Sequence, residues 1–221
     1  SYVVDCPHRE RLGYGGDSGT SMEMGMTNFM TAPLYVKWLH DWRDTQAPDG
    51  DLPHTAPNAQ IAGGGPAWSG ICITMPWMVY QQYGDLRVLE QSYPTMQRYL
   101  AFLETKQKDG ILAPYFGVGY TSQEWSFLGD WVSPNRGQGA DSRVDENSTL
   151  FFNNAYYLHN LQLAAQTAAL LGKPEDAANY TGQAQALAAR LHERFLNPDG
   201  ATYVNGEQPY LSMPLLFGIT P

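Results

Sequence analysis

Apolar side chains recur every three to four residues along most of this 221-residue chain, which is the spacing of one face of an α-helix. Residues 86–106, for example, carry Leu89, Tyr93, Met96 and Leu100 on one face of such a helix. The same spacing predicts helices over residues 21–43, 68–83, 148–171 and 174–196, and another that begins at residue 208.

Proline and glycine mark the boundaries of these predicted helices. Pro33 interrupts the first one, so we expect that helix to be kinked or divided. Gly84 and Gly172 each follow the last apolar residue of a helix, and Pro174 stands at an early helical position, which proline tolerates. Outside the helices, residues 201–204 are expected to form a short strand or an extended strap.

Two long segments rich in glycine and proline separate the predicted helices, at residues 45–66 and 107–146. Helix bundles usually have short connections, and long ordered loops are often functional. This layout predicts an all-α chain of consecutive helical hairpins. It is typical of a toroid of helices, in which the loops at one end of the ring carry the chemistry.

The segment Asp5–Asp17 gathers three carboxylates, two arginines and one aromatic ring. Its three glycines disfavour a continuous helix, and Pro7 restricts the residue before it. We therefore expect an irregular, tightly turned loop. Considered alone, this cluster fits a solvated surface or local salt bridges as well as it fits a functional site.

Composition excludes several classes of partner. The net charge of −9 disfavours nucleic acid and anionic membranes. No run of about 18 apolar residues exists, so no transmembrane helix is predicted. The aromatic fraction of 13% is high, and aromatic side chains are suited to stacking on sugar rings.

The N-terminus and the cysteines bear on the compartment. The chain opens on Ser1 without an initiator Met, which is typical of the interior of a longer protein. Cys6 and Cys72 can pair or remain free, and their spacing matches no zinc site. Asn147 and Asn179 begin N-glycosylation sequons, which favour an extracellular or periplasmic location.

Several catalytic motifs are absent from the sequence. It contains no Gly-x-x-x-x-Gly-Lys-Ser/Thr phosphate loop, no Gly-x-Ser-x-Gly elbow and no His-Glu-x-x-His metal site. The five histidines are scattered and are more typical of surface or core than of metal ligands. We therefore expect neither a metal nor a cofactor.

Acids and aromatic rings remain as the candidate chemistry. Glycoside hydrolysis needs two carboxyl groups, one protonated and one ionised at the working pH. An apolar wall or a neighbouring carboxylate raises the pKa of the protonated group. Asp5, Glu10 and Asp17 supply carboxylates in one segment, and Arg9 or Arg11 can hold one of them ionised. The apolar walls are expected from Trp68 and Trp131, each at the junction of a loop and a helix.

The acid-rich segment also resembles the signature of a known family. The segment DCPHRERLGYGGD at residues 5–17 is similar to the signature of the α-L-rhamnosidases of glycoside hydrolase family seventy-eight. Pro66–Trp68, Gly129–Trp131 and Leu170–Lys173 recur in that family in the same order, so the resemblance covers essentially the whole chain.

The resemblance implies a catalytic (α/α)6 toroid that releases terminal α-L-rhamnose from glycosides or polysaccharides with inversion of configuration. Glu10 would be the general acid that protonates the glycosidic oxygen. The substrate is held by two further groups of side chains. The resemblance implies hydrogen bonds to the rhamnose hydroxyls from Asp5, Arg9 and Asp17, and a pocket lined by Tyr14, Trp68 and Trp131.

The chain departs from the family pattern at two positions. Tyr14 stands where members usually have Trp, and it adds a hydroxyl to the ring. Ser69-Gly70 follows Trp68 where members commonly show Gly-Asp. Neither change removes the general acid.

The general base is the largest gap. In the family it is a Glu in a later helical unit, and none of the available carboxylates Glu124, Glu146 and Glu207 lies in a similar context. About six long helical segments are half of the number that the toroid needs. We therefore expect residues 1–221 to be the N-terminal half of an (α/α)6 catalytic domain, with the remainder outside this chain.

Two alternatives to the rhamnosidase hypothesis remain open. Tyr14 and Ser69-Gly70 allow another exo-glycosidase or a lyase on the same toroid. The missing base allows a carbohydrate-binding domain that kept the sugar pocket without turnover. Hydrolysis of only a different sugar in a panel of aryl glycosides would favour the first alternative. Binding of rhamnose without any product would favour the second.

Overall fold

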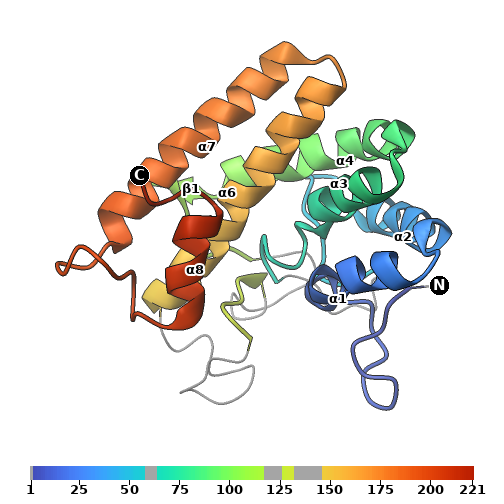
Figure 1. Cartoon of the computed structure of the whole chain (residues 1–221), viewed down its shortest axis with the longest axis horizontal. Coiled ribbons are helices and arrows are strands. Elements are labelled where there is room, and N and C mark those ends of the chain that lie inside the picture. The colour runs from blue at the N-terminus through green and yellow to red at the C-terminus, as the bar shows by residue number, and fades with distance from the viewer. Residues whose placement is uncertain (1, 58–63, 117–125, 132–145) are drawn as a thin grey trace.

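The computed structural model describes residues 2–57, 64–116, 126–131 and 146–221 of the chain (Figure 1). Within these ranges it contains seven α-helices and one two-stranded antiparallel hairpin. The elements are α1 (Gly15–Asn28), α2 (Ala32–Thr45), α3 (Ile71–Tyr83), α4 (Leu86–Glu104), β1 (Gln107–Lys108), β2 (Ile111–Leu112), α6 (Glu146–Leu170), α7 (Pro174–Phe195) and α8 (Gln208–Leu216).

The predicted helices and most of their boundaries are confirmed. The chain divides near Pro33, which occupies one of the first two positions of α2, where a missing N–H costs little. Gly84 follows α3 with a φ of 71°, and Gly172 follows α6 with a φ of 69°, both in the left-handed region that glycine adopts freely. The strap at residues 201–204 makes one isolated bridge, between Tyr203 and Leu196.

The start of α1 differs from the sequence-based expectation. We expected residues 5–17 to form one irregular loop, but Gly15, Gly16 and Asp17 belong to the first turn of α1. Trp68 lies against this turn, so that a Cβ on Gly15 would stand 2.1 Å from its carbonyl oxygen and one on Gly16 2.6 Å from its indole nitrogen. The two glycines are therefore required by close packing, which outweighs their poor helix propensity.

The hairpin of β1 and β2 was not predicted. Gln107 pairs with Leu112 and Lys108 with Ile111, and the turn between them is Asp109-Gly110. Both turn residues have positive φ, at 55° and 77°, which is the preference of an Asp-Gly hairpin turn. The buried Asn154 of α6 holds the hairpin, since it accepts from the Leu112 N–H at 2.7 Å and donates to the Leu112 carbonyl at 2.9 Å.

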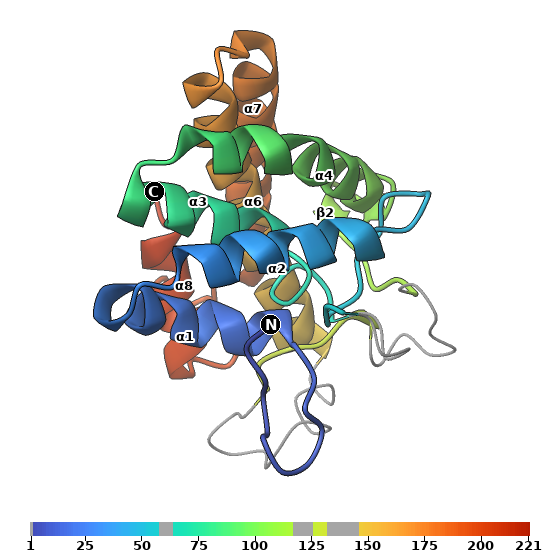
Figure 2. The same cartoon turned by 90° about the vertical axis from the view of Figure 1, so that its right-hand side faces the viewer.

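The helices form two layers. α1, α3, α6 and α8 contact one another in chain order, and α2, α4 and α7 pack on them. Figure 2 shows α4, α3, α2 and α1 as successive rows. α3 contacts α1, α2, α4 and α6, and accordingly it buries residues on several of its sides, among them Ile71, Ile73 and Met75.

The longest hairpin consists of α6 and α7, the antiparallel orange pair in Figure 1. α6 is buried along most of its length, whereas α7 buries one face through Tyr180, Leu187 and Leu191. The Asp176 carboxylate links α7 to α4, because it accepts a hydrogen bond from the Tyr93 hydroxyl at 2.7 Å. Consecutive hairpins in two layers confirm the predicted all-α class.

The described loop segments that precede α1, α3 and α6 meet at one end of the helices. Tyr14 pairs with Thr55, and a Cβ on Gly65 would stand 2.2 Å from the Asn153 side chain and 3.4 Å from the Ser126 carbonyl. The segment before α1 thus pairs with the loop before α3, and that loop in turn lies against segment 126–131 and α6. None of the helices in the described ranges combines the length and the apolar character that crossing a bilayer requires.

Candidate active site

The acid loop, which we define as residues 5–12, closes on itself. The Asp5 N–H donates to the Leu12 carbonyl at 3.1 Å, and the Arg11 N–H donates to the Cys6 carbonyl at 3.2 Å. The Leu12 N–H donates to the Asp5 carboxylate at 3.0 Å, and Arg11 adopts a φ of 59°, in the left-handed region. This closure brings the Asp5 and Glu10 side chains face to face across the loop.

Asp5 and Glu10 form a carboxyl pair whose pKa values move apart. A hydrogen bond with Asp5, burial and the nearby Asp5 charge raise the pKa of Glu10 above its usual value. Burial would also raise the pKa of Asp5, but hydrogen bonds from Glu10 and from the N–H groups of Cys6 and Leu12 outweigh it and lower that pKa. At a pH between the two pKa values, Glu10 is protonated and donates to the ionised Asp5.

Arg9 and Tyr14 also face Glu10. The Arg9 guanidinium lies 2.7 Å from the Glu10 carboxyl, and its charge opposes the rise in the Glu10 pKa. The Tyr14 hydroxyl shares a hydrogen bond with Glu10, which acts in the same direction as Arg9. Burial and the nearby charges of Glu10 and Asp5 raise the pKa of Tyr14, so its hydroxyl stays protonated and can donate.

Asp17 reaches the same cluster from a helix. It lies in the first turn of α1, where the N-terminal end of a helix favours a negative charge. Burial raises its pKa, and the charge of Asp5 adds to this effect. The structure thus brings together five of the predicted site residues, which are Asp5, Arg9, Glu10, Tyr14 and Asp17.

The anchor, which we define as residues 13–16 with residues 54–56 and Trp68, holds the acid loop on the helices. The Gly15 N–H donates to the His54 carbonyl at 2.9 Å, and the Ala56 N–H donates to the Gly13 carbonyl at 3.0 Å. The Trp38 indole of α2 donates to the Ala56 carbonyl at 2.7 Å and fixes this pairing to the helical layers.

Trp68 lies beneath the site. It is 8% exposed, packs on the first turn of α1, and its ring centroid is 6.2 Å from that of Phe152 on α6. In this position it supports the acid-bearing segment from below. Its role as a wall of the sugar pocket stays a prediction.

Trp131 is more accessible, with 43% of its surface exposed. It ends the described segment 126–131, which Asn153 of α6 holds by donating to the Leu128 carbonyl at 2.9 Å. Its neighbour Asp130 lies near Tyr156, whose pKa is raised by burial and then by that charge. Contact of Trp131 with a substrate also stays a prediction.

Two supporting residues escaped the sequence analysis. His54 is buried and packs beside Tyr14, and Asn153 is buried and holds segment 126–131. Of the three carboxylates considered for the base, Glu124 lies outside the described residues, Glu146 starts α6 and Glu207 precedes α8. None of these positions identifies a base.

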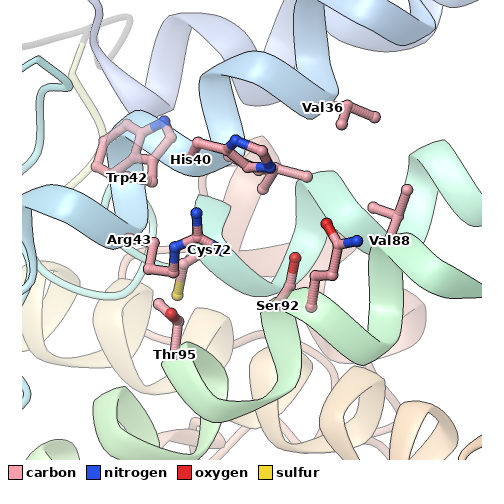
Figure 3. A pocket seen from close by; sticks show the side chains of 10 residues that line it. Val36, His40, Trp42, Arg43, Cys72, Val88, Ser92 and Thr95 are labelled. Carbon is pink, nitrogen blue, oxygen red and sulfur yellow. The ribbon is translucent and has the colours of Figure 1, made fainter.

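Two cavities lie away from the acid loop. One of about 20 Å³, lined by side chains of α2, α3 and α4 such as Trp42, Cys72 and Thr95, has room for about one water (Figure 3). The other, of about 290 Å³, lies between α6 and α7 and is lined by alanines, glutamines, Thr181 and Gly218. Neither has a carboxyl group in its lining, so neither supports acid catalysis.

Cysteine and metal chemistry are not built into the described site. Cys6 and Cys72 are both free thiols, so the pairing that the sequence left open does not form. In the described part of the chain, no three histidine, cysteine, aspartate or glutamate side chains gather as a metal site. The reactive groups of the described site are carboxyl groups, a phenol and a guanidinium.

Comparison with known proteins decides the family. The model of the bacterial α-L-rhamnosidase six-hairpin glycosidase domain matches residues 1–221. The chain belongs to this family. The resemblance carried by the segment at residues 5–17 is therefore confirmed.

Curated relatives agree with this assignment. An α-L-rhamnosidase of Streptomyces avermitilis is 33% identical over 98% of this chain, which covers 19% of that protein. An α-L-rhamnosidase of Formosa agariphila is 27% identical over 98% of this chain, which covers 22% of that protein. The chain thus spans about a fifth of the length of these relatives.

Solved structures confirm the six-hairpin fold. An α-L-rhamnosidase from Dictyoglumus thermophilum superposes with a TM-score of 0.86 at 30% identity, over all of this chain and 24% of the other. The Streptomyces avermitilis enzyme complexed with L-rhamnose superposes with a TM-score of 0.81 at 29% identity, over all of this chain and 19% of the other.

Proposed function

We propose that the full-length protein is an α-L-rhamnosidase in which Glu10 is the general acid. The observation that carries the proposal is the Asp5–Glu10 pair, because its hydrogen bond and charges raise the pKa of one carboxyl and lower that of the other. A raised pKa keeps Glu10 protonated at a pH where Asp5 is ionised. The family and the L-rhamnose complex of a relative support rhamnose as the released sugar.

In this mechanism Glu10 gives its proton to the glycosidic oxygen as the bond to the anomeric carbon breaks. The resulting carboxylate accepts a hydrogen bond from Tyr14 and faces the Arg9 guanidinium, both of which favour its charged form. Arg9, Asp5 and Asp17 offer a donor and acceptors to the sugar hydroxyls. Tyr14, Trp68 and Trp131 are proposed as the apolar lining of the pocket.

We further propose that the sugar is released by exo action with inversion of configuration. An inverting enzyme needs about 6.5–9.5 Å between its two carboxyl groups, so that water and sugar fit between them. Asp5 and Glu10 share a hydrogen bond, which excludes Asp5 as the base. The base is therefore a carboxylate outside the acid loop. An initial product of β-L-rhamnose from an α-L-rhamnoside, seen by NMR, supports inversion, and initial α-L-rhamnose contradicts it.

Substitution of Glu10 tests the function directly. We expect Glu10→Gln in the full-length protein to lower kcat/KM for phenyl α-L-rhamnoside by about 10²–10⁴-fold, the usual contribution of a general acid. Glu23→Gln, at an exposed glutamate of α1, is the matched control and should leave the rate unchanged. Unaltered hydrolysis by Glu10→Gln contradicts the proposal.

The alternatives give different results in the same assay. Activity on another aryl glycoside without activity on the rhamnoside favours a different exo-glycosidase. Binding of L-rhamnose without any product favours a carbohydrate-binding domain.

We also propose that residues 1–221 form about half of the toroid. Three complete hairpins and α8 occur in the described residues, whereas the family domain has six hairpins. Apolar side chains remain exposed on the described surface, at 89% for Met30, 74% for Leu215 and 75% for Leu216. Residues 1–221 expressed alone should bind a hydrophobic dye strongly, and the full-length protein should not.

A further inference from the structure

His54 is a buried side chain that the proposed reaction does not use. It is 1% exposed, and its ring centroid lies 5.0 Å from that of Tyr14 at an interplanar angle of 49°. The main chain fixes the same pair, since the His54 carbonyl accepts from the Gly15 N–H and Tyr14 pairs with Thr55. His54 and Tyr14 are thus held together both by their rings and by the backbone on either side.

The position of the Tyr14 ring determines where its hydroxyl lies. Tyr14 has two rotatable side-chain bonds, and contact with a buried ring restricts both of them. The hydroxyl then faces the Glu10 carboxyl, where it favours the ionised form, and Asp5 and Asp17 are close enough for their charges to act on it. A chain of contacts therefore leads from buried His54 through Tyr14 to the proposed acid.

His54 acts in this chain by its shape. Burial lowers its pKa to about 4, so the imidazole is neutral at pH values well above 4. A neutral ring adds no charge to the cluster of Asp5, Arg9, Glu10, Tyr14 and Asp17 that faces the phenol and the acid. The ring contact with Tyr14 is therefore the route by which the His54 side chain can act on Glu10.

We propose that His54 is a positioning residue, whose ring holds the Tyr14 phenol so that its hydroxyl donates to Glu10 and helps to set the pH range in which Glu10 carries the transferable proton. The inference rests on the proposed function of Glu10. The hydrogen bond favours the ionised carboxylate, so it lowers the pKa of Glu10 and opposes the effect of Asp5. Loss of the bond should let Glu10 keep its proton to a higher pH.

The test is the basic limb of the kcat/KM profile for an aryl α-L-rhamnoside, measured on the full-length protein. Tyr14→Phe keeps the ring but removes the hydroxyl, and we expect the limb to move up by about half to one pH unit. His54→Ala should move the limb in the same direction, and His54→Phe, which restores a ring, should return it toward the native value. The double variant His54→Ala/Tyr14→Phe should match Tyr14→Phe, because both changes remove the same interaction of the Tyr14 hydroxyl with Glu10.

A matched control separates positioning from a purely structural role. His159 of α6 is also a partly buried histidine, stacked on Phe217 with ring centroids 4.6 Å apart. His159→Ala should lower Tm without moving the limb. A limb that moves in Tyr14→Phe but not in His54→Ala overturns the role of His54, and a limb that moves in neither overturns the hydrogen bond.

Infrared spectroscopy reads the proton on Glu10 without turnover. The carbonyl band of the protonated Glu10 carboxyl is identified as the band that Glu10→Gln removes, and its loss with rising pH gives the pKa. Tyr14→Phe and His54→Ala should both raise this pKa. If the protein hydrolyses no rhamnoside but these shifts occur, the proposed function fails and the positioning role stands. If it hydrolyses the rhamnoside and the band does not shift, the positioning role alone fails.

Discussion

The acid loop and the anchor that holds it are opposites in physical character. Within the acid loop, Pro7–Arg11 are exposed, and the loop is closed by hydrogen bonds among its own residues. Most of the anchor is buried, and Gly15 and Gly16 approach Trp68 so closely that a Cβ on either does not fit. The charges of the site thus lie on the acid loop, which has little packing, beside the closely packed anchor.

This difference separates two kinds of substitution. Changes in the acid loop alter charge and hydrogen bonding near Glu10 and leave the packed interior untouched. Changes in the anchor alter the position of the whole loop and also the stability of the fold. The comparison predicts that substitutions in the anchor lower stability more than those in the acid loop, whereas pH dependence responds to the acid loop and, within the anchor, to Tyr14 and His54. The following variants test this from the largest expected loss of stability to the smallest.

Gly15→Ala should destabilise the fold most. Its Cβ would lie 2.1 Å from the Trp68 carbonyl oxygen, which is backbone and cannot rotate away. We expect the free energy of unfolding to fall by about 3 kcal/mol, at the upper end for overpacking. Gly19→Ala, in the same helix with nothing within 4 Å of its Cβ, should be neutral or stabilising. Equal Tm values for the two variants in thermal unfolding would refute the close contact.

Asn153→Ala tests the support of segment 126–131. It removes the donor to the Leu128 carbonyl and should lower the free energy of unfolding by about 2 kcal/mol, because a buried acceptor is left without its bond. The adjacent Asn154 binds Leu112 of the hairpin in a comparable way and is the matched control. Both variants should lower Tm, and only Asn153→Ala should also lower kcat/KM. A similar loss of activity in both argues against a role for segment 126–131 in the site.

Asp5→Asn should change the pH profile with little change in Tm, since an amide oxygen can still accept from the Leu12 N–H. Asp5 raises the pKa of Glu10 through its hydrogen bond and charge, so removing that charge lowers the Glu10 pKa. Glu10 then loses its proton at a lower pH, and the basic limb of the kcat/KM profile should move down. A limb that moves up contradicts the assignment of the acid to Glu10.

Arg9→Ala should give the smallest loss of stability, because the Arg9 side chain is 66% exposed and water screens its ion pair. Its charge lowers the pKa of Glu10, so its removal should move the basic limb up, opposite to Asp5→Asn. Arg87→Ala breaks a similarly exposed ion pair with Asp85 and is the matched control, which should leave the limb in place. Limb shifts of the same sign in Asp5→Asn and Arg9→Ala would show that the electrostatic account is wrong.

Local patterns in the sequence predict much of the fold. Apolar spacing places the helices, and Pro33, Gly84 and Gly172 mark boundaries because each acts on its own stretch of backbone. Asp109-Gly110 is a local signal for a hairpin turn, although residues 107–146 were predicted as one long loop. These features depend on residues a few positions apart, so a sequence can reveal them.

The site depends on contacts that no local pattern contains. The helical start at Gly15 follows from Trp68, and the importance of His54 follows from pairing between residues 13–15 and 54–56. Likewise, the opposite pKa shifts of Asp5 and Glu10 require the closed shape of the acid loop. The motif at residues 5–17 names candidate site residues, but their burial and mutual distances are visible only in the structure.

The most direct test of Glu10 as the general acid compares two leaving groups in the full-length protein. Phenyl α-L-rhamnoside needs a proton on its departing oxygen, whereas 2,4-dinitrophenyl α-L-rhamnoside has a leaving group stable enough to depart without one. We predict that Glu10→Gln lowers kcat/KM by more than about 10²-fold for the phenyl substrate and far less for the dinitrophenyl substrate. An equal loss on both substrates would contradict proton donation by Glu10.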